Sequence, residues 1–197
     1  MKRILTSLFF LVFLICVLTA CADPVRYSRM ETDAADFHPR AIGILSVDVG
    51  PHESAAGVID RFVFEELTRT GRYSRVLIPN DIHRIVEGEE ARPVLEEYLS
   101  KLEIVNFSDP DLSRRLGEIC RVDAFLLVSL SFWSYTVNTK DKNIAKVGLE
   151  MRLVEASTGR IVWTGHHFDE KRYRIVKPEL ADVGSSVARR LVRELSR

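Results

Sequence analysis

Residues 146–168, KVGLEMRLVEASTGRIVWTGHHF, decide the fold of this chain. Apolar side chains alternate with other residues from Val147 to Leu153, and the alternation resumes at Ile161. Alternation of this kind places one row of side chains on each face of a strand. The Ser-Thr-Gly between the two runs is typical of a tight turn. The stretch is therefore predicted to be a β-hairpin that turns at Ala156–Gly159.

The residues before this hairpin add a third strand to it. Residues 123–137, DAFLLVSLSFWSYTV, begin as a continuous apolar run and then alternate. A continuous apolar run is typical of a central strand that is buried on both faces. We expect three consecutive antiparallel strands, of which this is the first.

The remaining elements place helices around the three strands. Ser54 is positioned to cap the first helix and Gly71 to end it. Residues 88–111 are less regular, although ARPVLEEYLSKLEIV has a moderately helical pattern. The elements predicted outside the three strands are a strand at 41–49, a helix with an apolar stripe from Ala55 to Leu67, a strand at 73–78, a small helix from Asn80 or Asp81 to about Val86, a helix at 111–120 and a last helix opened by Pro178. Together they predict an α/β domain with a mixed sheet of about five strands and helices packed on it.

The N-terminus has the layout of a secretory signal. Lys2 and Arg3 precede an apolar run of 11 residues, Leu8–Leu18, and small residues lead from there to Cys21. An apolar run of this length is too short to favour a membrane-spanning helix. The alternative interpretations of this segment are an ordinary cleavable signal and an uncleaved membrane anchor.

Leu18-Thr19-Ala20-Cys21 resembles the lipobox of bacterial lipoproteins. The resemblance implies cleavage before Cys21, a diacylglycerol on its thiol and an acyl chain such as palmitate on its new amino group. Two or more acyl chains hold a protein firmly on a membrane. In the enteric sorting rule, Asp at the second position retains a lipoprotein in the inner membrane, so Ala22 implies the outer membrane, with the inner membrane as the less favoured location. The domains expected are a signal peptide at 1–20, a lipidated tether at 21–40 and a single periplasmic α/β domain at 41–197.

Charge content argues against nucleic-acid binding, and cysteine content argues against an intramolecular disulfide. The chain has 28 basic and 28 acidic residues, and loss of Lys2 and Arg3 with the signal would leave a slight acidic excess. A nucleic-acid-binding protein would need a strong basic excess, so none is expected as a partner. Cys120 is the one cysteine left once Cys16 is removed and Cys21 is acylated, so no intramolecular disulfide is expected.

No catalytic, cofactor-binding or metal-binding residues are predicted. Cys120 lies on the apolar side of its helix, which favours a packing role over that of a nucleophile. His166 and His167 point to opposite faces of a strand, so we expect surface positions at a strand edge rather than one metal site. Ser185 and Ser186 follow Gly184 in the middle of a helix, where small residues favour close helix packing. The other histidines, His38, His52 and His83, have no evident partner, and no HxxxH, CxxC, GxSxG, Walker or GxGxxG spacing occurs.

Three surface features remain as docking candidates. The aromatic residues Trp133, Tyr135 and Trp163 either form a binding platform or fill the core, and core filling is the favoured alternative. Residues Glu87–Asp111 contain eight acidic residues with Arg92 and Lys101 as the counter-charges. A basic run comprises Lys171, Arg172, Arg174 and Lys177. Each charged stretch is either a solvated surface or a docking site, and a docked partner is expected to be a protein.

Four stretches resemble a group of periplasmic α/β lipoproteins that includes the penicillin-binding-protein activator and the curli-secretion channel lipoproteins. They are IGILSV, GRYSRV, LGEICRVDAFLLVSL and LEMRLVEASTGRIVWTG, which span about 41–167. The residues that fill the recurrent positions are Gly71, Tyr73, Val76, Leu116, Gly117, Asp123, Ala124, Val154, Glu155, Ala156, Thr158, Gly159 and Trp163. The resemblance implies binding and assembly rather than catalysis. The chain differs from both named members of the group. The loop 138–143 is too short for an inserted membrane hairpin, which disfavours a pore role. The tether lacks the long Pro-rich stretch that lets an activator reach through the cell wall, which disfavours that role too.

The sequence thus predicts a non-catalytic outer-membrane lipoprotein without cofactors whose periplasmic domain binds or scaffolds another envelope protein. The alternative is an oligomeric structural component of an envelope export or assembly machine. An envelope hydrolase is disfavoured because no nucleophile and base can be paired.

Overall fold

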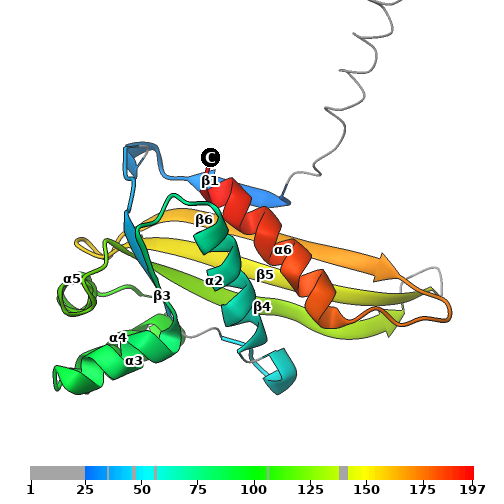
Figure 1. Ribbon diagram of the computed structural model, residues 1–197, viewed down its shortest axis with the longest axis horizontal. Helices are drawn as coiled ribbons and strands as arrows, with labels where there is room; N and C mark the ends of the chain where they lie inside the picture. Colours follow the sequence, from blue (N-terminus) through cyan, green and yellow to red (C-terminus); the bar gives the residue numbers. More distant parts are fainter. Residues whose placement is uncertain (1–24, 35, 46–47, 56, 106, 138–141) are drawn as a thin grey trace, which may run out of the picture.

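The computed structural model describes residues 25–34, 36–45, 48–55, 57–105, 107–137 and 142–197. These residues form one mixed sheet of six strands in the order β1-β6-β5-β4-β2-β3 (Figure 1). The strands are β1 (Tyr27–Met30), β2 (Ala41–Ile44), β3 (Arg75–Leu77), β4 (Ala124–Val137), β5 (Asn143–Glu155) and β6 (Ile161–Arg172). The helices are α2 (Val58–Arg69), α3 (Pro79–Gly88), α4 (Arg92–Val105), α5 (Pro110–Cys120) and α6 (Leu180–Leu195), with 3-10 turns at Thr32–Ala34 and Glu53–Ala55. The predicted α/β class is confirmed, and the sheet has one strand more than the five expected.

The antiparallel run β4–β5–β6 is the confirmed centre of the fold. The predicted hairpin joins β5 to β6 through a turn in which Gly159 has φ +68°. The N–H of Gly159 donates to the carbonyl of Glu155 over 2.9 Å, and the Thr158 hydroxyl donates to the Glu155 carboxylate over 2.6 Å. Glycine is needed here because a left-handed backbone conformation strains other residues. Local turn chemistry therefore fixes the pairing of these two strands.

Asp123 joins the antiparallel strands to the parallel ones. Its carboxylate accepts the N–H groups of Arg40 over 2.7 Å and of Ala41 over 2.9 Å, at the start of β2. β2 then runs parallel to both β4 and β3. The first five residues of β4, Ala124–Val128, are buried, as expected for a central strand. Asp123 thus aligns the starts of two strands that are 83 residues apart in sequence.

Part of the stretch predicted as a tether belongs to the sheet instead. Residues Tyr27–Met30 form β1, which pairs antiparallel with β6, and Ala34 is buried in the core. All four residues of β1 are exposed, so no alternation of apolar residues marked the strand in the sequence. The folded domain therefore begins before Ala41.

Three other boundaries differ from the prediction. β2 ends at Ile44, and beyond it Asp48 forms only a single bridge to Ser129. α2 begins at Val58 behind Gly57, because Ser54 lies in a 3-10 turn rather than at the helix cap. The last helix, α6, begins at Leu180 rather than at Pro178. Hydroxyl and proline signals mark a helix start only to within a few residues.

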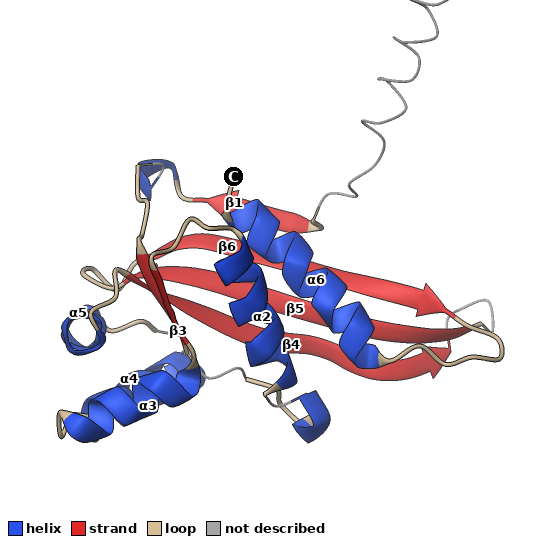
Figure 2. Ribbon diagram, viewed as in Figure 1, coloured by secondary structure: helices blue, strands red, loops and turns tan. Residues whose placement is uncertain are grey.

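Helices cover the two faces of the sheet unequally. α2 and α6 lie side by side across one face, which we call the closed face (Figure 2). α3, α4 and α5 gather at one end of the molecule, where they bury that end of the sheet on the other face (Figure 1). The long strands β4–β6 continue past these helices. The rest of that second face is called the open face below.

Candidate functional site

Cys120 is a core residue, as predicted. Its side chain is fully buried in the apolar cluster beneath α3, α4 and α5. Burial raises the pKa of its thiol to about 11, although the nearby Arg75 guanidinium opposes the rise. A thiol with that pKa is protonated at neutral pH and is a poor nucleophile.

The paired histidines point to opposite faces, as expected, but only His166 is partly exposed. His167 is 3% exposed, so its predicted surface position is wrong. It lies on the closed face, where α6 covers the middle of β6. Its Nε2 is 3.3 Å from the Asp169 carboxylate and 3.3 Å from a guanidinium nitrogen of Arg190. The hydrogen bond from His167, aided by the charge of Arg190, holds the pKa of Asp169 below its usual value.

This polar cluster does not have the composition of a metal site. Within the described ranges, no group of three or more His, Cys, Asp or Glu side chains is placed to hold a metal ion. A carboxylate beside a guanidinium and an imidazole is instead typical of a buried ion-pair network. Its position between β6 and α6 suits a role in attaching the helix to the sheet.

The aromatic residues proposed as a platform lie in or against the core. Trp133 and Trp163 are 8% and 2% exposed on the closed face. Their ring N–H groups donate to the hydroxyls of Ser54 and Ser28, both over 3.1 Å. The Tyr135 hydroxyl donates to the carbonyl of Pro178 over 2.8 Å. The core-filling interpretation of these rings is therefore the correct one.

Gly184 explains the small residues in the middle of α6. A Cβ atom there would lie 3.1 Å from the ring of Trp133 and 3.3 Å from the side chain of Ile59. The glycine therefore allows α6 to approach α2 and β4 closely, which confirms the predicted packing role for Gly184.

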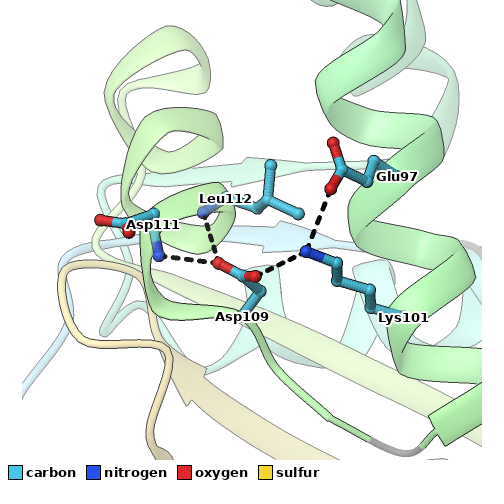
Figure 3. Close-up of polar contacts among 5 residues, drawn as sticks. All are labelled: Glu97, Lys101, Asp109, Asp111 and Leu112. Carbon is cyan, nitrogen blue, oxygen red and sulfur yellow. Dashed lines mark hydrogen bonds and ion pairs between the residues drawn. The ribbon is translucent and has the colours of Figure 1, made fainter.

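Much of the acidic segment 87–111 stabilises local structure (Figure 3). The Lys101 ammonium lies 3.0 Å from the Glu97 carboxylate and 2.7 Å from that of Asp109. Asp109 also caps α5, since its carboxylate accepts the N–H groups of Asp111 and Leu112. The hydrogen bond from Lys101 is the main reason that the pKa of Asp109 is lowered. These contacts join α4 to α5, so the segment is not simply a free anionic surface.

The open face carries a cluster of aromatic rings and cations that sequence reasoning missed. The rings of Phe132 and Phe168 meet edge to face, with their centroids 5.7 Å apart. The Lys146 ammonium lies 4.0 and 4.3 Å from the two centroids and 3.2 Å from the Glu170 carboxylate. The Arg26 guanidinium lies 3.7 Å above Phe168. Cation–π contacts of this kind hold rings in place at a surface.

A glycine on the middle strand makes room for this cluster. A Cβ atom on Gly148 would lie 2.7 Å from the Phe132 ring and 3.0 Å from the Cβ of Phe168. Phe132 nevertheless remains 36% exposed. Phe132 is next to Trp133 in the chain, and Phe168 is next to His167. Adjacent residues of a strand face opposite ways, so the sequence could have shown that these two rings lie on the face opposite Trp133 and His167.

The basic run lies at the end of the molecule opposite α3–α5 (Figure 1). Lys171 and Arg172 end β6, while Arg174 and Lys177 lie in the connection to α6. The Lys177 ammonium is 3.4 Å from the centroid of the Tyr135 ring. Cys21, the signal sequence and residues 138–141 lie outside the described residues. No helix in the described part of the chain has both the length and the apolar character needed to cross a membrane.

The chain forms an α/β domain. Helices cover one face of its sheet along the long strands, and they cover the other face only at one end. No family model matches the chain, and no curated protein matches its sequence. Solved structures do match. The PelC dodecamer from Paraburkholderia phytofirmans superposes with a TM-score of 0.55 at 14% identity, over 86% of this chain and 96% of that chain. Lipoprotein GNA1162 from Neisseria meningitidis gives 0.52 at 14% identity, over 79% and 97%.

These two likenesses establish the fold. The LpoB C-terminal domain from Salmonella enterica superposes with a TM-score of 0.40 at 12% identity, over 79% of this chain and 90% of that one. Solved structures with this fold thus include a lipoprotein, in line with the group that the sequence resembles.

Proposed function

We propose that this protein is an outer-membrane-anchored lipoprotein whose periplasmic domain binds or scaffolds another envelope protein and catalyses no reaction. The observation that supports binding most directly is the open face. It displays two ordered rings, Phe132 and Phe168, among flanking charges, and no helix of the described chain covers them. Rings and cations fixed before contact lose little side-chain freedom when a partner binds.

The proposed anchor is Cys21, acylated on both its thiol and its amino group. The support is the lipobox-like Leu18-Thr19-Ala20-Cys21 after a short apolar run. Cys21→Ala is expected to abolish metabolic labelling with acyl chains and to release the protein from the membrane fraction. Unchanged labelling would contradict the assignment.

A photo-crosslinking residue on the open face tests the binding role. It replaces Phe132 in the full chain, and the matched control places it at Ile104, which is 79% exposed on α4. We expect the Phe132 position to capture one envelope protein reproducibly in intact cells. The proposal fails if nothing is captured there, or if the control position captures the same protein in equal yield.

The alternative is an oligomeric structural component of an export or assembly machine. One specific observation favours it, since PelC, which shares the fold, is a dodecamer. In that case the residue at Phe132 would crosslink to a second copy of this chain. Light scattering of the purified protein would then give a ring-sized mass rather than that of a monomer.

A further inference from the structure

The connection between β6 and α6 exposes two large apolar side chains. Ile175 is 95% exposed and Val176 is 82% exposed, more than any other large apolar residue in the described part of the chain. They are adjacent, and they lie between Arg174 and Lys177. Neither contributes to the core, so their exposure is not explained by the fold.

A hollow lined by cations lies beside this connection. Lys142, Arg172 and Arg174, together with Asn143 and Tyr173, line an open hollow of about 440 Å³ at this end of the sheet. Arg172 and Arg174, like Lys171, form no ion pair with another described residue. The hollow therefore presents several positive charges and a phenol to one small anionic group, and phosphate is such a group.

The N-terminal strand runs so that the chain before it heads toward the same end of the sheet. β1 runs antiparallel to β6, with Tyr27 opposite His166, and Arg26 lies over Phe168. The chain before β1 therefore leaves the sheet toward the end of β6. From Phe168 to Arg172, β6 advances about 13 Å. Four peptide links separate Val25 from Cys21, a span of at most about 14 Å. A chain of that length can thus span from Val25 to about the level of Arg172, where β6 ends and the connection with Ile175 and Val176 begins.

We propose that this end of the domain, the basic tip, is a second membrane contact that rests on an anionic bilayer. The basic tip comprises Lys171, Arg172, Arg174, Ile175, Val176 and Lys177. Ile175 and Val176 enter the interface between headgroups and acyl chains, and the cations bind lipid phosphates. Apolar side chains combined with clustered cations are the features that hold proteins at anionic membrane surfaces.

The contact would orient the whole domain. The basic tip and the α3–α5 end lie at opposite ends of the long axis (Figure 1). With the tip on the membrane, the long strands stand away from the bilayer, and the open face is displayed between the two ends. This inference rests on the lipid anchor of the proposed function, because the anchor brings the tip close to a membrane.

Fluorescence from a single labelled cysteine tests the contact. Ile175→Cys is made in the full lipidated chain, labelled with a polarity-sensitive dye and reconstituted into phosphatidylcholine vesicles with or without phosphatidylglycerol. Ile104→Cys on α4 is the matched control, since it is also an exposed isoleucine. The buried Cys120 and the acylated Cys21 are not expected to take up dye.

Spin-labelled acyl chains should quench the dye at Ile175 several-fold more strongly than the dye at Ile104, and phosphatidylglycerol should strengthen the quenching. Arg172→Gln and Arg174→Gln should each lower, by about fivefold, the ratio of molecules whose tip is bound to the bilayer to molecules whose tip is free. Equal quenching at the two sites would overturn the proposal. Quenching at Ile175 that does not respond to phosphatidylglycerol, or a crosslink from the tip to a protein, would overturn it as well.

Acyl labelling of the same samples distinguishes a failure of the proposed anchor from a failure of the basic-tip contact. Protein without an acyl label shows that the anchor assignment has failed. Acylated protein with equal quenching at Ile175 and Ile104 shows that only the basic-tip contact has failed.

Discussion

The closed and open faces of the ribbon β4–β6 share their backbone but differ in what covers them. On β5, Val147, Leu149 and Met151 are fully buried on the closed face. Between them, Gly148 and Glu150 point to the open face, where nearby Phe132 stays 36% exposed. Because successive residues of a strand face opposite ways, one stretch of sequence serves the core and the surface at once. Substitutions one residue apart should therefore have very different costs.

The largest effect is expected at Trp163 on the closed face. Trp163→Ala removes one of the largest fully buried side chains and the hydrogen bond to Ser28. The loss should lower the free energy of unfolding by about 3–5 kcal/mol, measured by urea denaturation. Phe132→Ala, its open-face counterpart, should cost about 1 kcal/mol because the ring is partly solvated already. If Trp163→Ala and Phe132→Ala lowered the free energy of unfolding equally, Phe132 would have to be as well buried in the folded protein as Trp163.

A pair of glycines sharpens the comparison further. A Cβ atom on Gly165 would lie 2.4 Å from the Trp163 ring and 3.1 Å from Leu191, and the helix layer leaves neither room to move. Gly165→Ala should therefore cost about 1–3 kcal/mol through overpacking. Gly148→Ala should cost less, because the partly exposed Phe132 ring can give up its contacts with Lys146 and Phe168 and turn into solvent, so that only the 3.0 Å approach to the Phe168 Cβ is left to relax. Thermal denaturation of both variants measures the difference, and the reverse order would contradict the contrast between the faces.

Glu66 tests how the helices of the closed face are held together. It is 7% exposed, and its carboxylate contacts Arg69 on α2 over 2.5 Å and Arg189 on α6 over 3.1 Å. Glu66→Gln keeps the shape but weakens both charge-assisted hydrogen bonds, at a cost of about 1.5–3 kcal/mol. The control Glu65→Gln breaks an exposed pair with Arg61 and should change stability by less than about 0.5 kcal/mol. Urea denaturation of the two variants gives both values.

A smaller effect that depends on pH is expected at Asp169. Its pKa lies below the ordinary 3.8 because His167 donates a hydrogen bond to it and Arg190 adds favourable charge. The unfolded chain therefore takes up the proton first as pH falls. The stabilisation is complete well above pH 3.8 and is lost as pH drops toward the lowered pKa. Asp169→Asn should cost about 1 kcal/mol at neutral pH, and the difference from the wild type should shrink in acid. A difference that does not change with pH would show that the carboxylate charge is unimportant.

Sequence reasoning was most successful where neighbouring residues specify the structure. Alternation and the Ser-Thr-Gly turn identified the hairpin, and the apolar run from Ala124 identified the central strand. The position of Cys120 on an apolar helix face predicted its burial. Each of these depends on the period of a single strand or helix, which the sequence displays directly.

Contacts between distant segments were the part that sequence reasoning missed. β1 has no apolar pattern of its own, and pairing with β6 is what makes it a strand. His167 was predicted to be exposed because nothing near it in sequence shows that α6 crosses above it. The cluster of Phe132, Lys146 and Phe168 draws one residue from each of three strands, and it depends on strand register.

The sequence by itself determined the antiparallel run β4–β5–β6, the turn at Gly159, the buried thiol and the lipobox-like start. It could do so because each feature is set within about ten residues by backbone sterics and side-chain period. Only the tertiary structure decided which face of the sheet is covered, and where the N-terminal strand points. Those properties follow from how helices far away in the chain pack on the sheet. The face under α2 and α6 became core over the length of the long strands, while part of the other face stayed exposed to solvent.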